Sequence, residues 1–187
     1  MTGGADIESL CARLHLDQIS CRQFVEQCVR SASLSVGTSA AMLLLFDSQP
    51  ADRSLRCVAR YDRRDDAIAE GVGPRHAGAG PFMDALDAHR HVLTDDAPRC
   101  PSTRDLCRSS PFDPRVHALI ATPFSLNGRL FGAFACIDDD PAARHSVQHL
   151  FLLRRISVRA TLAMATALSN DWTLMMGRGW AGGGRAS

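Results

Sequence analysis

Two apolar runs joined by an Asn-Gly turn constrain the fold of this chain more than any other feature. The first run lies within residues 116–124, and the second lies within residues 130–137 and ends at Asp138. Between them stands Asn127-Gly128, the pair of residue types that most readily adopts the positive φ angles of a tight turn. The pattern predicts a β-hairpin whose two strands are largely buried.

Helical patterns stand on both sides of this hairpin. Residues 17–35 and 146–168 have apolar positions three or four apart, which is typical of amphipathic helices. Asp17 is the expected N-cap of the first helix. Pro81 is suited to the first turn of a short helix that extends to about residue 88.

Further strands are predicted between the helices. Residues 40–46 form a solid apolar run, residues 55–61 alternate, and residues 91–94 are a short apolar segment. Residues 97–114 are polar and rich in proline, which predicts a loop. A loop of this length usually forms a functional lid. Grouped antiparallel strands with terminal helices predict an α+β fold.

Composition narrows the class of protein. A chain of 187 residues suits one domain, and the net charge of +1 favours neither nucleic acid nor a membrane surface as a partner. No apolar stretch reaches the roughly 18 residues needed to span a membrane. The first residues lack a secretory signal, so we expect a cytoplasmic protein whose seven cysteines are reduced thiols.

The order of these elements resembles a GAF domain, the small-molecule-sensing and dimerising module of bacterial signalling proteins. The most specific resemblance lies in residues 118–124, the Asn127-Gly128 turn and residues 130–136. The resemblance covers residues 17–169, which leaves a lead-in over 1–16 and a Gly-rich, flexible tail over 170–187. It implies a central antiparallel sheet of five to six strands, with the terminal helices on one face and the short helix plus a lid loop on the other.

The resemblance also implies a ligand site between the sheet and residues 81–114, which we call the lid segment. If the hairpin turns only over Asn127 and Gly128, strand alternation places a set of mostly small side chains on one face, and a slip of one residue would exchange the faces. The residues expected to line the site are Phe82, Met83, His91, Arg104, Phe112, His117, Ala118, Ile120, Thr122, Ala133, Ala135 and Ile137. The sequence does not identify the ligand or a cofactor.

Cys100 and Cys107 raise an enzymatic alternative. One GAF branch reduces free methionine sulfoxide with cysteines that precede the short helix and the hairpin, and neither place holds a cysteine here. In a reductase of this kind, Cys100 and Cys107 would have to act instead, with neighbouring arginines to lower a thiol pKa. The same pair with His89 and His91 lacks the Cys-x-x-Cys spacing of a zinc site, so no metal is expected.

These observations favour a non-enzymatic sensor. The ligand would enter beneath the lid segment, and the helices over 17–35 and 146–168 would form a homodimer through a second apolar stripe at Phe151, Val158 and Leu162. The signal would then pass to a separate output protein. A ligand-free dimerisation module is the remaining alternative, and it predicts a site filled by Phe82, Met83 and Phe112.

Overall fold

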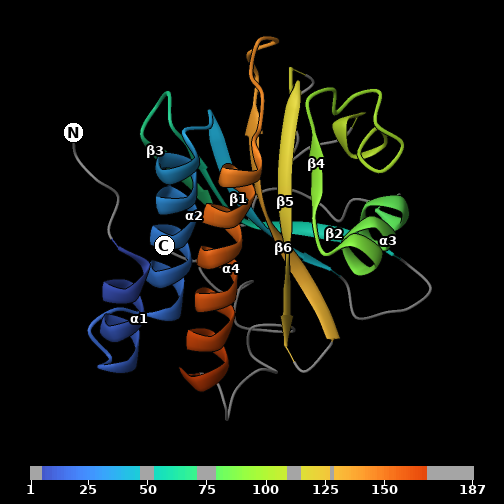
Figure 1. The fold of residues 1–187 in the computed structure, drawn as a ribbon. Helices are drawn as coiled ribbons and strands as arrows, with labels where there is room; N and C mark the ends of the chain where they lie inside the picture. The colour runs from blue at the N-terminus through green and yellow to red at the C-terminus, as the bar shows by residue number, and fades with distance from the viewer. Residues whose placement is uncertain (1–5, 47–52, 71–78, 109–114, 127–128, 168–187) are drawn as a thin grey trace, which may run out of the picture.

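A six-stranded antiparallel sheet forms the centre of the computed structural model, which describes residues 6–46, 53–70, 79–108, 115–126 and 129–167 (Figure 1). The strand order is β3-β2-β1-β6-β5-β4. The strands are β1 (Ala40–Phe46), β2 (Leu55–Asp62), β3 (Ala67–Glu70), β4 (Val92–Thr94), β5 (Ala118–Leu126) and β6 (Arg129–Asp138). The helices are α1 (Ile7–His15), α2 (Cys21–Val36), α3 (Gly80–His89), the 3-10 turn η1 (Leu106–Arg108) and α4 (Val147–Ala167).

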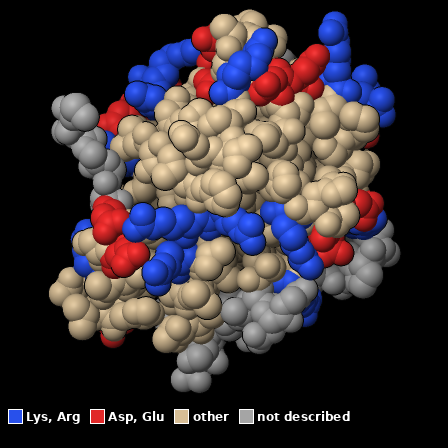
Figure 2. Space-filling model, viewed as in Figure 1, with Lys and Arg blue, Asp and Glu red and all other residues tan. Residues whose placement is uncertain are grey.

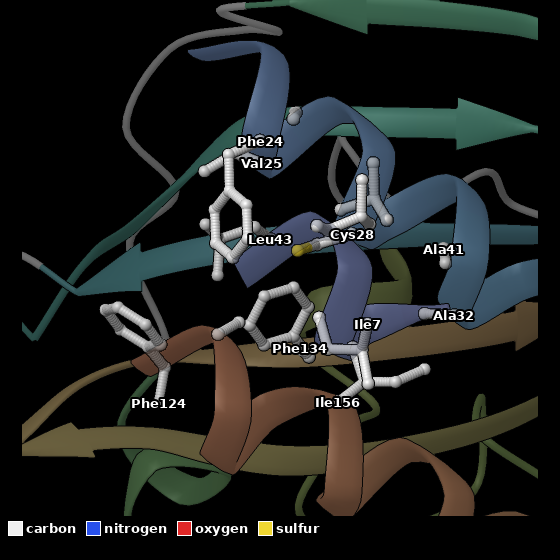
Figure 3. Close-up of a cluster of buried hydrophobic side chains, with 14 of the residues drawn as sticks. Ile7, Phe24, Val25, Cys28, Ala32, Ala41, Leu43, Phe124, Phe134 and Ile156 are labelled. Atoms are coloured by element: carbon white, nitrogen blue, oxygen red, sulfur yellow. The ribbon is translucent and has the colours of Figure 1, made fainter. Parts of the chain in front are cut away.

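Two apolar cores lie on the two faces of this sheet. Helices α1, α2 and α4 cover what we call the helix face, where Figure 3 shows Phe24, Leu43 and Phe134 pointing toward one another. The rings of Phe124 and Phe134 meet edge to face at 6.1 Å. Helix α3 and η1 cover the opposite face, which we call the lid face. The expected α+β fold, with helices on both faces of the sheet, is confirmed.

The N-terminal helices differ from the prediction at one boundary. The helix expected to begin at Asp17 begins at Cys21, because Ser20 caps it and forms a reciprocal capping box with Gln23. Asp17 has a φ of +53° in the turn before this helix. Residues 7–15 form a helix of their own, α1, which packs into the helix-face core.

The hairpin is present, but its register contains one extra residue. Phe124 pairs with Gly132 while Ser125 pairs with Leu130, so Phe131 bulges out of the ladder. Because of the bulge, every β5 residue up to Phe124 shares a face with the opposite set of β6 residues from the set expected without it. Asn127 and Gly128 themselves lie outside the described residues.

This bulge corrects the predicted hairpin faces. Ala133, Ala135 and Ile137 lie on the lid face, as does Leu119. Ile120 belongs to the helix-face core, and strand alternation places Ala118 and Thr122 on that same face. The prediction that Ala118, Ile120 and Thr122 share a face with Ala133, Ala135 and Ile137 is therefore wrong. The cause of this error is the bulge at Phe131, which no turn residue in the sequence indicates.

Two features are absent from the described residues. None of their helices is long and apolar enough to cross a membrane. They also contain no cluster of three or more His, Cys, Asp or Glu side chains that could hold a metal ion.

Candidate functional site

Helix α3 forms the part of the lid segment that packs directly on the sheet. Pro81 lies in its first turn, and the next turns bury Phe82 and Leu86 completely. The Phe82 ring meets Phe46 edge to face at 6.3 Å, and Met83 is partly buried beside them. The lid face beneath α3 is therefore lined with close-packed apolar side chains.

The remaining expected ligand contacts are spread along the lid segment and the start of β5. His91 is half-buried, with Nδ1 2.9 Å from the carbonyl oxygen of His89. Arg104 is exposed and lies 3.5 Å from the Asp105 carboxylate. His117 lines a separate open hollow with Asp95, Asp96, Arg99 and Arg144. Phe112 lies outside the described residues.

The two lid cysteines have different environments. Burial raises the pKa of the Cys100 thiol, but hydrogen bonds from the side chain and backbone of Ser102, and from Thr103 and Thr94, outweigh burial and leave that pKa below its ordinary value. The Sγ atom of Cys100 lies 3.2 Å from the Ser102 hydroxyl. Burial and the neighbouring Cys100 raise the pKa of Cys107 to about 11. Both thiols are free.

Alkylation should distinguish these two cysteines. Because only the thiolate is nucleophilic, Cys100 should react with iodoacetamide at least about tenfold faster than Cys107 at pH 7.5. The rate at Cys100 should rise with pH to a midpoint below that of a free cysteine, since its pKa is lowered. Peptide mass mapping over a pH series measures both rates, and equal rates at the two positions would contradict the assignment.

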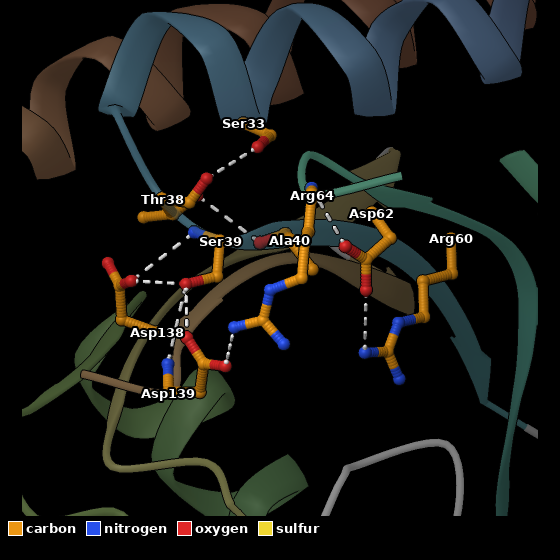
Figure 4. A network of polar contacts seen from close by, with 9 residues as sticks. All are labelled: Ser33, Thr38, Ser39, Ala40, Arg60, Asp62, Arg64, Asp138 and Asp139. Atoms are coloured by element: carbon orange, nitrogen blue, oxygen red, sulfur yellow. Dashed lines mark hydrogen bonds and ion pairs between the residues drawn. The ribbon is translucent and has the colours of Figure 1, made fainter. Parts of the chain in front are cut away.

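A polar pocket of about 350 Å³ opens where β1 begins and β2 and β6 end, and we call it the arginine pocket (Figure 4). Arg60 and Asp62 on β2 pair with Met42 and Ala40, whose side chains belong to the lid-face core, so the pocket lies on that face. Val116 and Ile137 give it an apolar wall. Its polar lining consists of Thr38, Ser39, Arg60, Asp62, Arg63, Arg64, Arg115, Asp138 and Asp139.

The chain reaches this pocket from α2 through a sharp turn. Gly37 has a φ of +82°, a left-handed conformation that glycine adopts without strain, and it ends α2. The next residues, Thr38 and Ser39, then enter the pocket. The Thr38 hydroxyl donates to the Ala40 carbonyl at 3.2 Å, and the Ser33 hydroxyl donates to the Thr38 carbonyl at 2.8 Å.

Aspartates from β6 fix one side of the pocket. The Ser39 hydroxyl lies 2.6 Å from Asp138 and 2.7 Å from Asp139. Arg64 donates to Asp139 at 2.6 Å. The hydrogen bond from Ser39, followed by that from Arg64, holds the pKa of Asp139 below its usual range. This network holds the Asp139 carboxylate ionised and in place on one wall of the pocket.

The balance of charge in the pocket is positive. Four arginines and three aspartates line it, and Arg60 lies 3.6 Å from Asp62. Arg63 makes no side-chain hydrogen bond or ion pair with the part of the chain that the structure describes. Guanidinium groups bind carboxylate and phosphate groups with two parallel hydrogen bonds, so a pocket lined by four arginines suits an anion.

Sequence reasoning missed the arginine pocket. Its signals were the arginines at positions 60, 63 and 64 and the aspartates at positions 138–140. A run of aspartates at the end of a strand is usually solvated, so neither segment alone predicts a pocket. The structure brings the two segments together because β1 pairs with both β2 and β6.

Comparisons with known proteins identify the fold. Models of protein families and curated protein sequences give no match. Among solved structures, residues 122–287 of a methyl-accepting chemotaxis protein match at 18% identity and a TM-score of 0.65, covering 87% of this chain and 99% of that one. The phycocyanobilin-bound GAF domain of a cyanobacterial phytochrome matches at 14% and 0.66, covering 89% and 98%.

A third similar structure is an enzyme. Free methionine-R-sulfoxide reductase from Neisseria meningitidis, in complex with its substrate, matches at 13% identity and a TM-score of 0.63, covering 87% of this chain and 88% of that one. Identities this low establish the fold alone. The element order, the sheet topology and these matches together show that the chain has the GAF fold.

Proposed function

We propose that this GAF fold is a sensor or regulatory domain that binds a small anionic molecule on the lid face and passes the signal to a separate partner protein. The observation that carries the proposal is the arginine pocket, where four arginines and an apolar wall of Val116 and Ile137 line the same cavity. A ligand could place an acidic group on the arginines and its apolar part against that wall. The ligand can shift the equilibrium between two signalling states only by the difference in its affinity for them.

Native mass spectrometry of freshly purified protein tests the ligand. A mass that is present under native conditions and absent under denaturing conditions would identify the bound molecule directly. The native spectrum of the Arg63→Gln variant should lack the ligand mass, because the pocket then loses a charged pair of hydrogen-bond donors. Arg13→Gln, which removes an exposed arginine from α1, should retain it. A wild-type protein whose native mass equals that of the polypeptide alone would contradict tight ligand binding.

The proposal includes a homodimer formed through α4. Five large apolar side chains of this helix are exposed, and Figure 2 shows a broad uncharged area on the face that carries α4, bordered by arginines. Exposed apolar surfaces of this kind mark protein contacts. The five residues are Val147, Phe151, Leu152, Val158 and Leu162.

Phe151→Asp should convert the dimer to a monomer. The side chain is 63% exposed, so the substitution leaves the core intact while placing a charge in the proposed interface. Hot-spot aromatic residues typically contribute about 2 kcal/mol or more, so the dimer dissociation constant should rise by about 30-fold or more. Sedimentation equilibrium measures it, with Ala88→Asp as the control, because Ala88 is exposed on α3, on the other side of the sheet. A wild-type monomer would exclude the dimer.

A thiol enzyme is the second candidate, and the lowered pKa of Cys100 favours it. The similar methionine sulfoxide reductase suggests free methionine sulfoxide as the substrate to assay. Cys107→Ser separates the two functions: a reductase that uses the Cys100–Cys107 pair would lose turnover, whereas a sensor would keep its ligand. Wild-type protein without turnover would exclude the reductase.

A further inference from the structure

A second pocket lies on the opposite face of the sheet, in a groove between β5 and α4. Its volume is about 350 Å³, and we call it the β5–α4 groove. We propose that this groove is a separate binding site for a small molecule with a carboxylate or phosphate group and a short apolar part. The residues that line it are Arg90, Thr122, Pro123, Ser125, Arg154, Ser157, Val158, Thr161 and Leu162.

The charges of the groove favour an anion. Arg90 and Arg154 line it, and none of the lining residues is acidic. Arg90 lies 3.6 Å from the exposed carboxylate of Asp87. Arg154 makes no hydrogen bond or ion pair with the described residues, whereas Arg155, the next residue on α4, pairs with Glu8 at 3.3 Å. The two arginines together form a site with net positive charge.

The floor of the groove contains hydroxyl groups in two different states. Ser157 donates to the Pro123 carbonyl at 2.7 Å, and Thr161 donates to the Ser157 carbonyl at 2.7 Å. Thr122 is completely buried, and its hydroxyl has no hydrogen-bond partner in the described part of the chain. An unsatisfied buried hydroxyl costs about 1–3 kcal/mol of stability. Because this oxygen is shielded from solvent, a ligand in the groove would reach it only after a local movement of the floor.

One wall of the groove is apolar. Val158 and Leu162 are 49% and 54% exposed, and they follow one another by one turn of α4. An anion with a short hydrocarbon part could therefore place its charge between Arg90 and Arg154 and cover these two side chains. Both residues also belong to the exposed stripe of α4, so such a ligand would compete with the proposed dimer contact for these two side chains.

Amide NMR titration with sodium phosphate and sodium hexanoate tests the site. Hexanoate should saturate shifts at the amides of Thr122, Ser125 and the α4 turn around Ser157. If phosphate also shifts these amides, an oxyanion alone suffices for binding in the groove. If only hexanoate shifts them, binding also requires the apolar wall. Either result supports the groove, whereas shifts confined to residues 60–64 with both probes would overturn it.

Two neighbouring arginines provide a matched comparison. Arg154→Gln should weaken hexanoate binding by about tenfold or more, because it removes a charge-assisted hydrogen bond. Arg155→Gln makes the same charge change one residue away and should leave affinity within about twofold, since Arg155 does not line the groove. Equal losses in both variants would indicate attraction to net charge alone and would contradict the site.

Thr122→Val provides a readout that does not depend on charge. The two side chains are nearly the same shape, and the variant removes the unpartnered hydroxyl. The free protein should keep or gain thermal stability, and hexanoate affinity should stay within about twofold because the hydroxyl is shielded from the groove. A stable variant with clearly weakened affinity would show that the floor moves and lets the ligand reach the hydroxyl.

Discussion

Gly132→Ala should unfold this domain or destabilise it by about 3 kcal/mol or more, at the upper end of what overpacking costs. Gly132 lies in the centre of the sheet on β6, where a Cβ atom would overlap the carbonyl oxygen of Leu44 and lie 3.1 Å from the Cα atom of Leu45. Both are backbone atoms of β1, which pairs on its two sides with β2 and β6. The backbone cannot move away without breaking ladder hydrogen bonds, and urea denaturation measures the loss.

Gly80→Ala is the matched control. The same methyl group at the start of α3 would meet only the side chain of Arg53, at 3.8 Å. Alanine is also the better helix former, so stability should stay within about 0.5 kcal/mol or rise. Similar losses in both variants would show that the close approach of β6 to β1 is not what makes Gly132 necessary.

The two strands of the hairpin illustrate how far the sequence could predict this fold. Apolar runs and an Asn-Gly pair predicted the strands and their pairing correctly, because these signals are local. The placement of Ile120 and Thr122 depended on register, and the bulge at Phe131 changed it. The bulged residue is apolar, like its neighbours, so no change in pattern marks it.

The start of α2 shows a different limit of prediction from sequence. Asp17 and Ser20 are both good N-cap residues, and the pattern of apolar positions allowed either. The choice was made by Gln23, which completes a capping box only with Ser20. This second signal was present in the sequence and could have placed the boundary.

The candidate sites could not be predicted in the same way, because each joins segments distant in sequence. Arg64 and Asp139 meet across the sheet only because β1 lies between β2 and β6. Arg90 and Arg154 come together through the packing of α4 on β5. Charges in exposed segments carry no periodic signal, so their proximity follows from topology alone.

Phe82→Ala should destabilise the lid face by about 3–5 kcal/mol, the usual cost of truncating a buried phenylalanine. Phe82 is completely buried, and its ring packs on Phe46. Because α3 lies outside the sheet, we expect the helix-face core to stay folded while a cavity opens beneath α3. Such apolar cavities bind small apolar molecules, so benzene should raise the melting temperature of the variant and leave that of the wild type unchanged.

This experiment also separates a lid site that is open from one filled by its own side chains. Met83 is only partly buried, so Met83→Ala should cost much less than Phe82→Ala and should not respond to benzene. If Phe82→Ala costs under about 1 kcal/mol, the side chain does not fill the space beneath α3. If benzene stabilises the wild type as well, the lid face already contains an open cavity, and a ligand could enter there without displacing Phe82.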